Sequence, residues 1–431
     1  MKKKSAGKRR AIIITGAVSL TIYLIVSVVF WFTGMPKRFF RYKVKEDNTI
    51  SIDYYSGFFP LLRIPDKIDG LPVTEIDTRL NEYYKVNDHK ERTNYLAKLT
   101  VAVHIPDSVE ILHSNAFNGF SSLTYVNIPS GLRSTENEVF AGTKVRKLVF
   151  PEGITEIGVG YEENGLNYCS FASMKYLQKV VFPESLKKIG NSAFSDCPRL
   201  RRVTLPEGLE KIEFGAFQKS GLTEINIPKN LKKIGGCLFR ETPFEKKLEN
   251  KTDGDFIILN GDTIYKYIGK DENVIIPDNI TSICDRAFQG SPIRSVTIPE
   301  GVKKVGGAFE FSGIEKIELP DTVEDDDLEF YYCIYLKDIR LPENTTKIRN
   351  RAFKECYSLE NIVLPEGITK IGADAFALCT SLERIVIPES VAYIGSDAFT
   401  GCTSLKEVVI KGDPVIEENA FNDCSLLRDK P

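Results

Sequence analysis

The stretch IVLPEGITKIGADAFALCTSLER, from Ile362 to Arg384, decides the fold, because a near copy follows it directly. The copy reads IVIPESVAYIGSDAFTGCTSLKE and runs from Ile385 to Glu407. Both copies are 23 residues long, and a period of roughly 20–29 residues is typical of solenoid repeats. One such unit has too little apolar surface to fold alone, so neighbouring copies must stack on one another. The sequence therefore predicts a repeat solenoid.

One proline and one phenylalanine mark nearly every copy of the repeat. The proline ends a short strand, because it has no N–H to give to a β-ladder. The phenylalanine follows ten or eleven residues later in nearly every copy, and thirteen copies fill residues from about 100 to 427. The prolines are Pro106, Pro129, Pro151, Pro183, Pro206, Pro228, Pro277, Pro299, Pro320, Pro342, Pro365 and Pro388. The phenylalanines, which we expect to form one buried column, are Phe117, Phe140, Phe171, Phe194, Phe217, Phe239, Phe288, Phe309, Phe330, Phe353, Phe376, Phe399 and Phe421.

A single copy shows the coil that the pattern predicts. Leu382, Ile385 and Ile387 carry the apolar side of a short strand. Arg384 and Val386 alternate with them and are expected to point the other way. After the proline turn, a second apolar pair returns beneath the strand, and the Ala-Phe step begins a short helical or irregular turn.

This frame resembles the BspA-like leucine-rich repeats, the bacterial surface-antigen type, over about three quarters of the chain. Residues 63–76, RIPDKIDGLPVTEI, look like that family's opening repeat, and residues 253–277 look like its mid-array hairpin. Unlike the more familiar leucine-rich frame, this one has no asparagine ladder after the strand. The resemblance implies a right-handed coil of short parallel strands, turns and short helical segments. It also implies a bacterial surface protein that acts by binding and is not an enzyme.

The N-terminus predicts a membrane anchor. Residues 1–10, MKKKSAGKRR, carry six basic side chains, and residues 11–34 carry no charge. At about 1.5 Å per residue, a helix over that uncharged stretch is long enough to cross a bilayer core. A cleaved signal peptide is the alternative, but its apolar region would be shorter and would end in small residues. We expect a transmembrane signal anchor at 11–34, a cytoplasmic tail at 1–10 and the repeats outside the cell membrane, although basic residues after the span weaken the charge argument for this orientation.

Breaks in the period divide the rest of the chain. Residues 35–98 are expected to hold a juxtamembrane segment, an N-terminal cap with the opening repeat, and an insertion with a short helix over about 81–97. Residues 99–242 form the first block of leucine-rich repeats. Residues 243–276 insert a β-hairpin, because Asn260-Gly261 lies between two apolar runs. Residues 277–431 form the second block.

Neither composition nor motifs favour catalysis. The net charge is −2, so no global basic field favours nucleic acid.

Six of the nine cysteines stand three residues after the repeat phenylalanine. Free, buried thiols are expected there, although the spacing of the coils also permits disulfides. Asp325, Asp326 and Asp327 could ligate calcium, but no calcium-binding frame surrounds them and a solvated corner is favoured. We expect no cofactor, no metal and no nucleic-acid partner.

The remaining candidate site is the outward side of the strands. The residues four and two before each proline project from it, and in the first block they include Tyr125 and Asn127. Lys147, Lys179 and Arg202 occupy the first of these positions in three successive copies and would stack into one cationic stripe. A solvated surface is the alternative interpretation. The hypothesis is a partner-binding face for a protein or a cell-surface polymer.

Together these observations predict a membrane-anchored, cell-surface leucine-rich-repeat protein that acts as a non-catalytic binding or adhesion module. A structural spacer, or an accessory subunit of a surface complex, is the alternative. A surface hydrolase built from the insertions is less favoured, because no acid–base cluster is evident.

Overall fold

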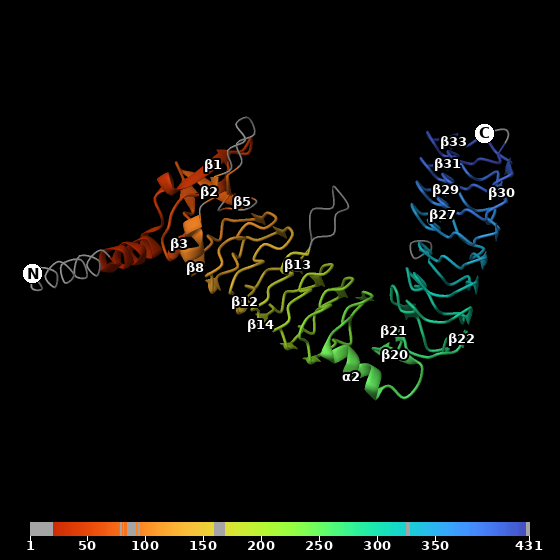
Figure 1. Cartoon of the computed structure of the whole chain (residues 1–431), viewed down its shortest axis with the longest axis horizontal. Helices are drawn as coiled ribbons and strands as arrows, with labels where there is room; N and C mark the ends of the chain where they lie inside the picture. Colours follow the sequence, from red (N-terminus) through yellow and green to blue (C-terminus); the bar gives the residue numbers. More distant parts are fainter. Residues whose placement is uncertain are drawn as a thin grey trace, which may run out of the picture. The chain divides into compact units, whose positions relative to one another are not determined.

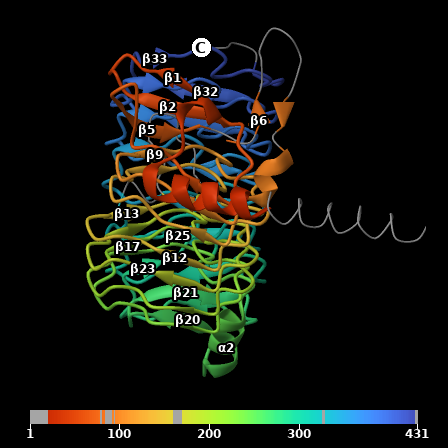
Figure 2. The same cartoon turned by 90° about the vertical axis from the view of Figure 1, so that its left-hand side faces the viewer.

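The computed structural model of the protein describes residues 20–77, 80, 82–83, 92–93, 95–158, 169–324 and 328–427. The chain divides into two compact units, of which unit 1 extends to residue 233 and includes 238–246, and unit 2 comprises 234–237 and the chain from 247 onward. Each unit is a stack of short coils (Figure 1). Figure 2 shows the coils edge on, with their strands stacked as rungs.

Each coil of the repeat carries a strand before the proline, called the front strand here. β30 (Arg384–Ile387) is a front strand, and it pairs in parallel with β32 (Glu407–Ile410) of the next coil. Its side chains alternate between exposed or half-buried and buried, as the apolar pattern predicts. The other front strands are β3 (Leu61–Arg63), β8 (Ala102–His104), β10 (Tyr125–Val126), β12 (Lys147–Val149), β14 (Lys179–Val181), β16 (Arg202–Val203), β18 (Glu224–Ile225), β22 (Asn273–Ile275), β24 (Ser295–Thr297), β25 (Lys316–Glu318), β26 (Asp338–Arg340) and β28 (Asn361–Ile362).

Most coils also carry a second short strand after the proline, called the back strand here. It contains the last residue of the apolar pair that returns beneath the front strand, as Ile371 does in β29. The sequence did not predict that this segment pairs in a sheet. The back strands are β9 (Ile111–Leu112), β11 (Ser134–Thr135), β13 (Glu156–Ile157), β15 (Lys188–Ile189), β17 (Lys211–Ile212), β19 (Lys233–Ile234), β21 (Thr263–Tyr267), β23 (Ser282–Ile283), β27 (Lys347–Ile348), β29 (Lys370–Ile371), β31 (Tyr393–Ile394) and β33 (Val415–Ile416). Two sets of parallel rungs thus enclose the core of each unit.

The repeat phenylalanines are buried in the core of each unit, as predicted. Phe376 is fully buried, and its ring stacks on Phe353 at 5.2 Å and on Phe399 at 5.1 Å between centroids. All thirteen repeat phenylalanines are buried. Left-handed residues flank the rings: Asp374 has φ +54° and Leu378 has φ +64°, and residues two before or two after the phenylalanine repeat this in most coils. These reversals turn the chain around each ring and let it pack on the next coil.

The N-terminal cap closes the first coil of unit 1. β1 (Phe40–Val44) pairs antiparallel with β2 (Ile50–Tyr55), and β2 pairs in parallel with β5 (Leu71–Ile76). β4 (Lys67–Ile68) adds a short antiparallel edge to β5. Ile50, Ile52 and Tyr55 are fully buried, so the cap covers apolar surface that the first coil would otherwise expose.

The insertion after the cap differs from the expected helix. β6 (Glu82–Tyr83) pairs antiparallel with β7 (Arg92–Thr93), and a 3₁₀ helix, η2 (Tyr95–Leu99), follows. A continuous helix over 81–97 is therefore wrong, because strands lie inside that range. The described residues of this stretch pair as two short antiparallel strands instead.

The N-terminal helix is described from residue 20 to residue 33 and is followed by the 3₁₀ helix η1 (Lys37–Phe39). It packs on the cap, where the ring of Tyr23 stacks on Phe58 at 5.9 Å and on Phe59 at 5.7 Å. The first part of the predicted transmembrane anchor, residues 11–19, lies outside the described residues. Among the residues that are described, no helix is long and apolar enough to cross a membrane.

A helix and a hairpin lie between the two blocks of repeats. Helix α2 (Pro243–Lys251) begins after Thr242, whose Oγ1 accepts a hydrogen bond of 3.1 Å from the backbone N–H of Glu245. β20 (Phe256–Leu259) pairs antiparallel with β21, with Asn260 and Gly261 at φ +54° and +85° in the turn. β21 also pairs in parallel with β23, so the hairpin leads into the back strands of unit 2. The helix went unpredicted, although Thr-Pro-x-Glu is a helix-start signal.

Candidate ligand-binding face

The front strands of unit 1 carry the predicted stripe. Lys147, Lys179 and Arg202 are the first residues of β12, β14 and β16, and all three are exposed. Lys147 lies directly opposite Lys179 in the parallel pair, and β14 contacts β16 in the next coil. Neighbouring strands are about 4.8 Å apart. Three cationic side chains therefore follow one another along the stack.

The stripe is part of a larger surface, which we call the basic face. Residues 143–150, 174–182 and 198–205 contain eight basic residues and no acidic residue. All eight are exposed: Lys144, Arg146, Lys147, Lys175, Lys179, Arg199, Arg201 and Arg202. Sequence reasoning missed five of them because it considered only positions four and two before the proline. The positions five and seven residues before the proline hold most of these five cations.

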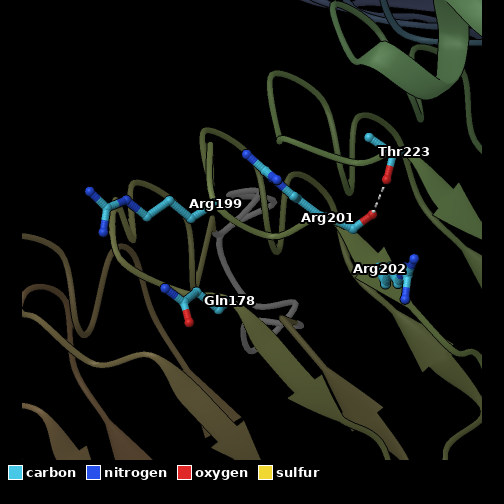
Figure 3. Close-up of a pocket in the computed structure, with 5 residues that line it drawn as sticks. All are labelled: Gln178, Arg199, Arg201, Arg202 and Thr223. Atoms are coloured by element: carbon cyan, nitrogen blue, oxygen red, sulfur yellow. Dashed lines mark hydrogen bonds between the residues drawn. The ribbon is translucent and has the colours of Figure 1, made fainter.

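A hollow of about 680 Å³ opens on this face, lined by Gln178, Arg199, Arg201, Arg202 and Thr223 (Figure 3). In that view the side chains of Arg199, Arg201 and Gln178 extend toward the same side, and Arg202 lies apart from them. Oγ1 of Thr223 donates to the carbonyl of Arg201 at 3.0 Å, which links two adjacent coils.

The side chain of Arg199 is positioned by an aromatic ring of the preceding coil. Its guanidinium lies 4.9 Å from the ring centroid of Tyr176. A cation over an aromatic ring is attracted by the negative face of the ring and keeps its charge. Arg199 is therefore oriented without being neutralised.

Among the residues that the structure describes, one cation of the basic face has a carboxylate partner. Arg202 lies opposite Glu224 of the next coil, with Nε 3.1 Å from a carboxylate oxygen. Within the described part of the chain, the other seven form no ion pair. On the N-terminal side the face ends at Thr124 and Tyr125, which hold the corresponding positions. The basic face is thus a bounded patch of three coils.

The matching positions of unit 2 carry alternating charges. Five residues before the proline, Glu315 pairs with Arg294 at 3.3 Å and with Lys337 at 2.7 Å. Four residues before it, Arg384 pairs with Glu407 at 2.7 Å. Further pairs across neighbouring coils at these two positions are Arg294–Glu272, Lys316–Asp338 and Lys406–Glu383. The same coil geometry therefore supports charge pairing where the sequence provides both signs.

Other stacked lysines of unit 1 have a counter-charge. Lys188 lies opposite Lys211 on the back strands, as Lys147 lies opposite Lys179 on the front. Glu213 is close to this back column, 3.8 Å from Lys188 and 3.1 Å from Lys233. Within the described residues, Lys147 and Lys179 form no ion pair with a carboxylate, and this distinguishes the basic face from the back strands.

The structure gives the two neutral candidates different roles. Oδ1 of Asn127 accepts a 2.8 Å hydrogen bond from the N–H of Ile105, and its Nδ2 donates to the Ile105 carbonyl at 2.7 Å. Asn226 holds Leu205 in the same way. The amide of Asn127 therefore joins two coils, and its part in the partner-binding face stays a prediction. Tyr125 is 54% exposed and borders the basic face, where its ring meets the edge of Trp31 at 6.3 Å.

The cysteines and acidic residues were the other candidates for a site. Seven of the nine cysteines are buried, and Cys169 and Cys237 are half-buried. Cys197, Cys356, Cys379, Cys402 and Cys424 each donate from the thiol to the carbonyl of a phenylalanine in the preceding coil. Within the residues described, no group of three or more acidic, histidine or cysteine side chains is placed to hold a metal ion. The acidic run at 325–327 lies outside those residues.

The repeat pattern of the whole array matches a known family. The family profile for the BspA type leucine rich repeat region (6 copies) matches residues 94–161, 163–250, 261–327 and 307–428. The chain belongs to this family. In this BspA-type protein, the basic face at residues 143–205 falls within the first two matched ranges.

Solved leucine-rich-repeat structures are similar to this BspA-type chain. The T. pallidum leucine-rich-repeat protein is 28% identical, with a TM-score of 0.40, over 51% of this chain and 97% of that chain. A leucine-rich cell surface protein from Faecalibacterium prausnitzii is 24% identical, with a TM-score of 0.39, over 88% and 95%. A leucine-rich-repeat protein from Bacteroides ovatus is 22% identical, with a TM-score of 0.34, over 90% and 91%. No curated protein matches the chain significantly.

Proposed function

We propose that this protein is a non-catalytic binding module on a cell surface, and that its partner docks on the basic face of unit 1. The partner is a protein or a surface polymer with negative charge. The observation that carries the proposal is the set of seven exposed cations on three adjacent coils without a carboxylate partner among the described residues.

Stability gives no reason for such a surface. Like charges in register on neighbouring strands repel one another, so an unliganded fold loses free energy by keeping them together. Unit 2 has opposite charges at the same positions, for example Lys316 opposite Asp338 and Arg384 opposite Glu407. An anionic partner would supply the missing charge in unit 1 and offset the repulsion.

The proposal includes membrane attachment through the N-terminal helix. The uncharged stretch at 11–34 supports an anchor. The outward side of the described helix also carries exposed apolar side chains: Leu20, Ile22, Leu24, Ile25, Val28, Val29 and Phe32. We expect the full-length protein to stay in the membrane pellet after alkaline carbonate washing, with repeats that protease removes from intact cells. A soluble mature form starting near residue 40, or repeats protected from protease, would contradict the anchor.

Capture of surface material by the full-length protein tests the binding function. The variant K147S/K179S/R202S should retain less surface extract than the parent, most clearly at low salt, because exposed charges are screened over about 8 Å at physiological ionic strength. The matched control K211S/K229S/K303S removes the same charge from exposed lysines outside the face. If both variants capture as much as the parent, the basic face is only a solvated surface and a spacer or accessory role is favoured.

A further inference from the structure

We propose that the occupant of the basic face is a linear acidic glycan whose carboxylate or sulfate groups are bound by successive coils. This inference rests on the proposed binding function and names its ligand class. It is carried by three features of the face: the type of cation, the direction in which the cations extend, and the polar groups between them.

The type of cation points to oxyanions. Three guanidinium groups of the face, those of Arg146, Arg199 and Arg201, have no acidic partner within the described part of the chain. A guanidinium presents a planar fork of N–H donors that matches two oxygens of one carboxylate or sulfate group. Two of these forks line the same hollow (Figure 3). A ligand with oxyanions can therefore make paired hydrogen bonds there as well as charge contacts.

The direction of the cations points to a chain. Every coil from residue 143 to residue 205 contributes at least two cations, and the coils succeed one another at about 4.8 Å. A single small anion would reach one coil or two. A polymer that crosses the front strands and carries acidic groups along its length can contact all three coils.

The neutral polar side chains of the hollow suit the hydroxyl groups of a sugar better than the bases of a nucleic acid. The exposed amide of Gln178 can both donate and accept, and the hydroxyl of Thr223 keeps acceptor capacity while it donates to Arg201. Single-stranded nucleic acid binds by stacking bases on free aromatic faces. On these three coils the ring of Tyr176 is covered by Arg199, and Tyr125 at the border contacts Trp31. Sugar hydroxyl groups between acidic groups fit this lining.

The ends of the face limit the length of ligand that it can read. Glu224 pairs with Arg202 at one end, and the neutral Thr124 and Tyr125 stand at the other. A bound chain gains contacts until it spans three coils and then gains few more. Affinity should therefore rise from short to longer oligosaccharides and then level off.

The test uses full-length protein in detergent and two series of oligosaccharides, one derived from heparin and one from polygalacturonic acid. Isothermal titration at low salt should show affinity that rises with length and then levels off in at least one series. Binding by the heparin series alone indicates that sulfate groups are required, and binding by the polygalacturonate series, alone or together with heparin, indicates that carboxylate groups suffice. R199S/R201S should bind at least about tenfold more weakly than the parent, because the loss of a charged hydrogen bond changes the affinity by about tenfold or more.

Two controls separate charge from geometry. R199K/R201K keeps both charges but loses the forks, so we expect an affinity between those of the parent and R199S/R201S. K211S/K229S removes two charges elsewhere and should bind as the parent does. Equal binding by the parent and R199S/R201S, or no binding of either series, overturns the inference. If an acidic peptide or a DNA oligonucleotide binds through the face instead, the proposed ligand class is wrong while the binding function stands. If no ligand binding depends on the basic face, the ligand class and the proposed binding function both fail.

Discussion

The thiol of Cys379 donates a hydrogen bond of 3.2 Å to the carbonyl oxygen of Phe353 in the preceding coil. Cys356 bonds to Phe330 in the same way at 3.1 Å, and Cys402 bonds to Phe376 at 3.2 Å. The phenylalanine column and the cysteine column are therefore tied together, coil to coil. This explains why cysteine stands three residues after the ring: it fills a small space and satisfies a buried carbonyl.

Thiol labelling tests this arrangement. Burial raises the pKa of Cys197 and of Cys356 to about 12, so both stay protonated and unreactive at neutral and mildly alkaline pH. We expect iodoacetamide at pH 8 to modify only Cys169 and Cys237, the two half-buried cysteines, in the native protein. Denaturant should expose the other seven. Mass spectrometry that finds Cys356 alkylated as fast as Cys169 in native protein would contradict the buried column.

Truncation of the phenylalanine column should be costly. Phe376 is fully buried between two stacked rings, so Phe376→Ala removes apolar contacts and leaves a cavity. The expected loss is about 3–5 kcal/mol of unfolding free energy, measured by urea denaturation. Tyr335, which is 55% exposed, is the control, and Tyr335→Ala should change stability by less than about 0.5 kcal/mol. A loss below about 1 kcal/mol at Phe376 would be incompatible with a core residue.

Asn127 should behave as a structural residue. Asn127→Ala leaves the backbone N–H and C=O of Ile105 without their side-chain partner. We expect the unfolding free energy to fall by about 1–3 kcal/mol. Asn226→Ala should cost a similar amount, because Asn226 holds Leu205 by the same two bonds. Thermal unfolding measures both variants. Unchanged stability with weaker ligand capture in Asn127→Ala would return this residue to the binding site.

The sequence predicted the coil better than the contacts between coils. The proline and phenylalanine intervals were sufficient for the stack, because each copy repeats the same strand, turn and ring. The back strands other than β21, such as Lys370–Ile371, are only two residues long and show no alternation that marks a strand. The role of Asn127 depends on Ile105, 22 positions earlier in the preceding coil, which spacing within one copy does not reveal. The same holds for Arg202, whose partner Glu224 lies one coil further on.

Trp31 reports on the docking of the N-terminal helix, since it is the only tryptophan of the chain. Its ring lies edge-on to His104 at 6.1 Å and to Tyr125 at 6.3 Å. Burial lowers the pKa of His104, and the charge of Arg63 adds to this effect, so the imidazole is neutral at pH 7. Acidification should change Trp31 fluorescence with a midpoint below the ordinary histidine value of about 6.5. His104→Asn should abolish the transition; a transition that survives in this variant would have another origin.

Relief of charge repulsion on the basic face should stabilise the unliganded protein. Lys147 and Lys179 face each other in register, about 4.8 Å apart, without a counter-ion among the described residues. In low salt, the unfolding free energy of K147S/K179S should therefore equal that of the parent or exceed it by up to about 0.2–1 kcal/mol. The unfolding temperature should be the same or slightly higher. The gain should shrink as salt is added, because added ions already screen the repulsion. Lys316→Ser is the matched control, since this lysine lies 3.8 Å from Asp338 and its loss should not stabilise unit 2. Destabilisation of K147S/K179S at low salt would mean that the two lysines stabilise the fold, and the physical argument for an anionic ligand would then lose its basis.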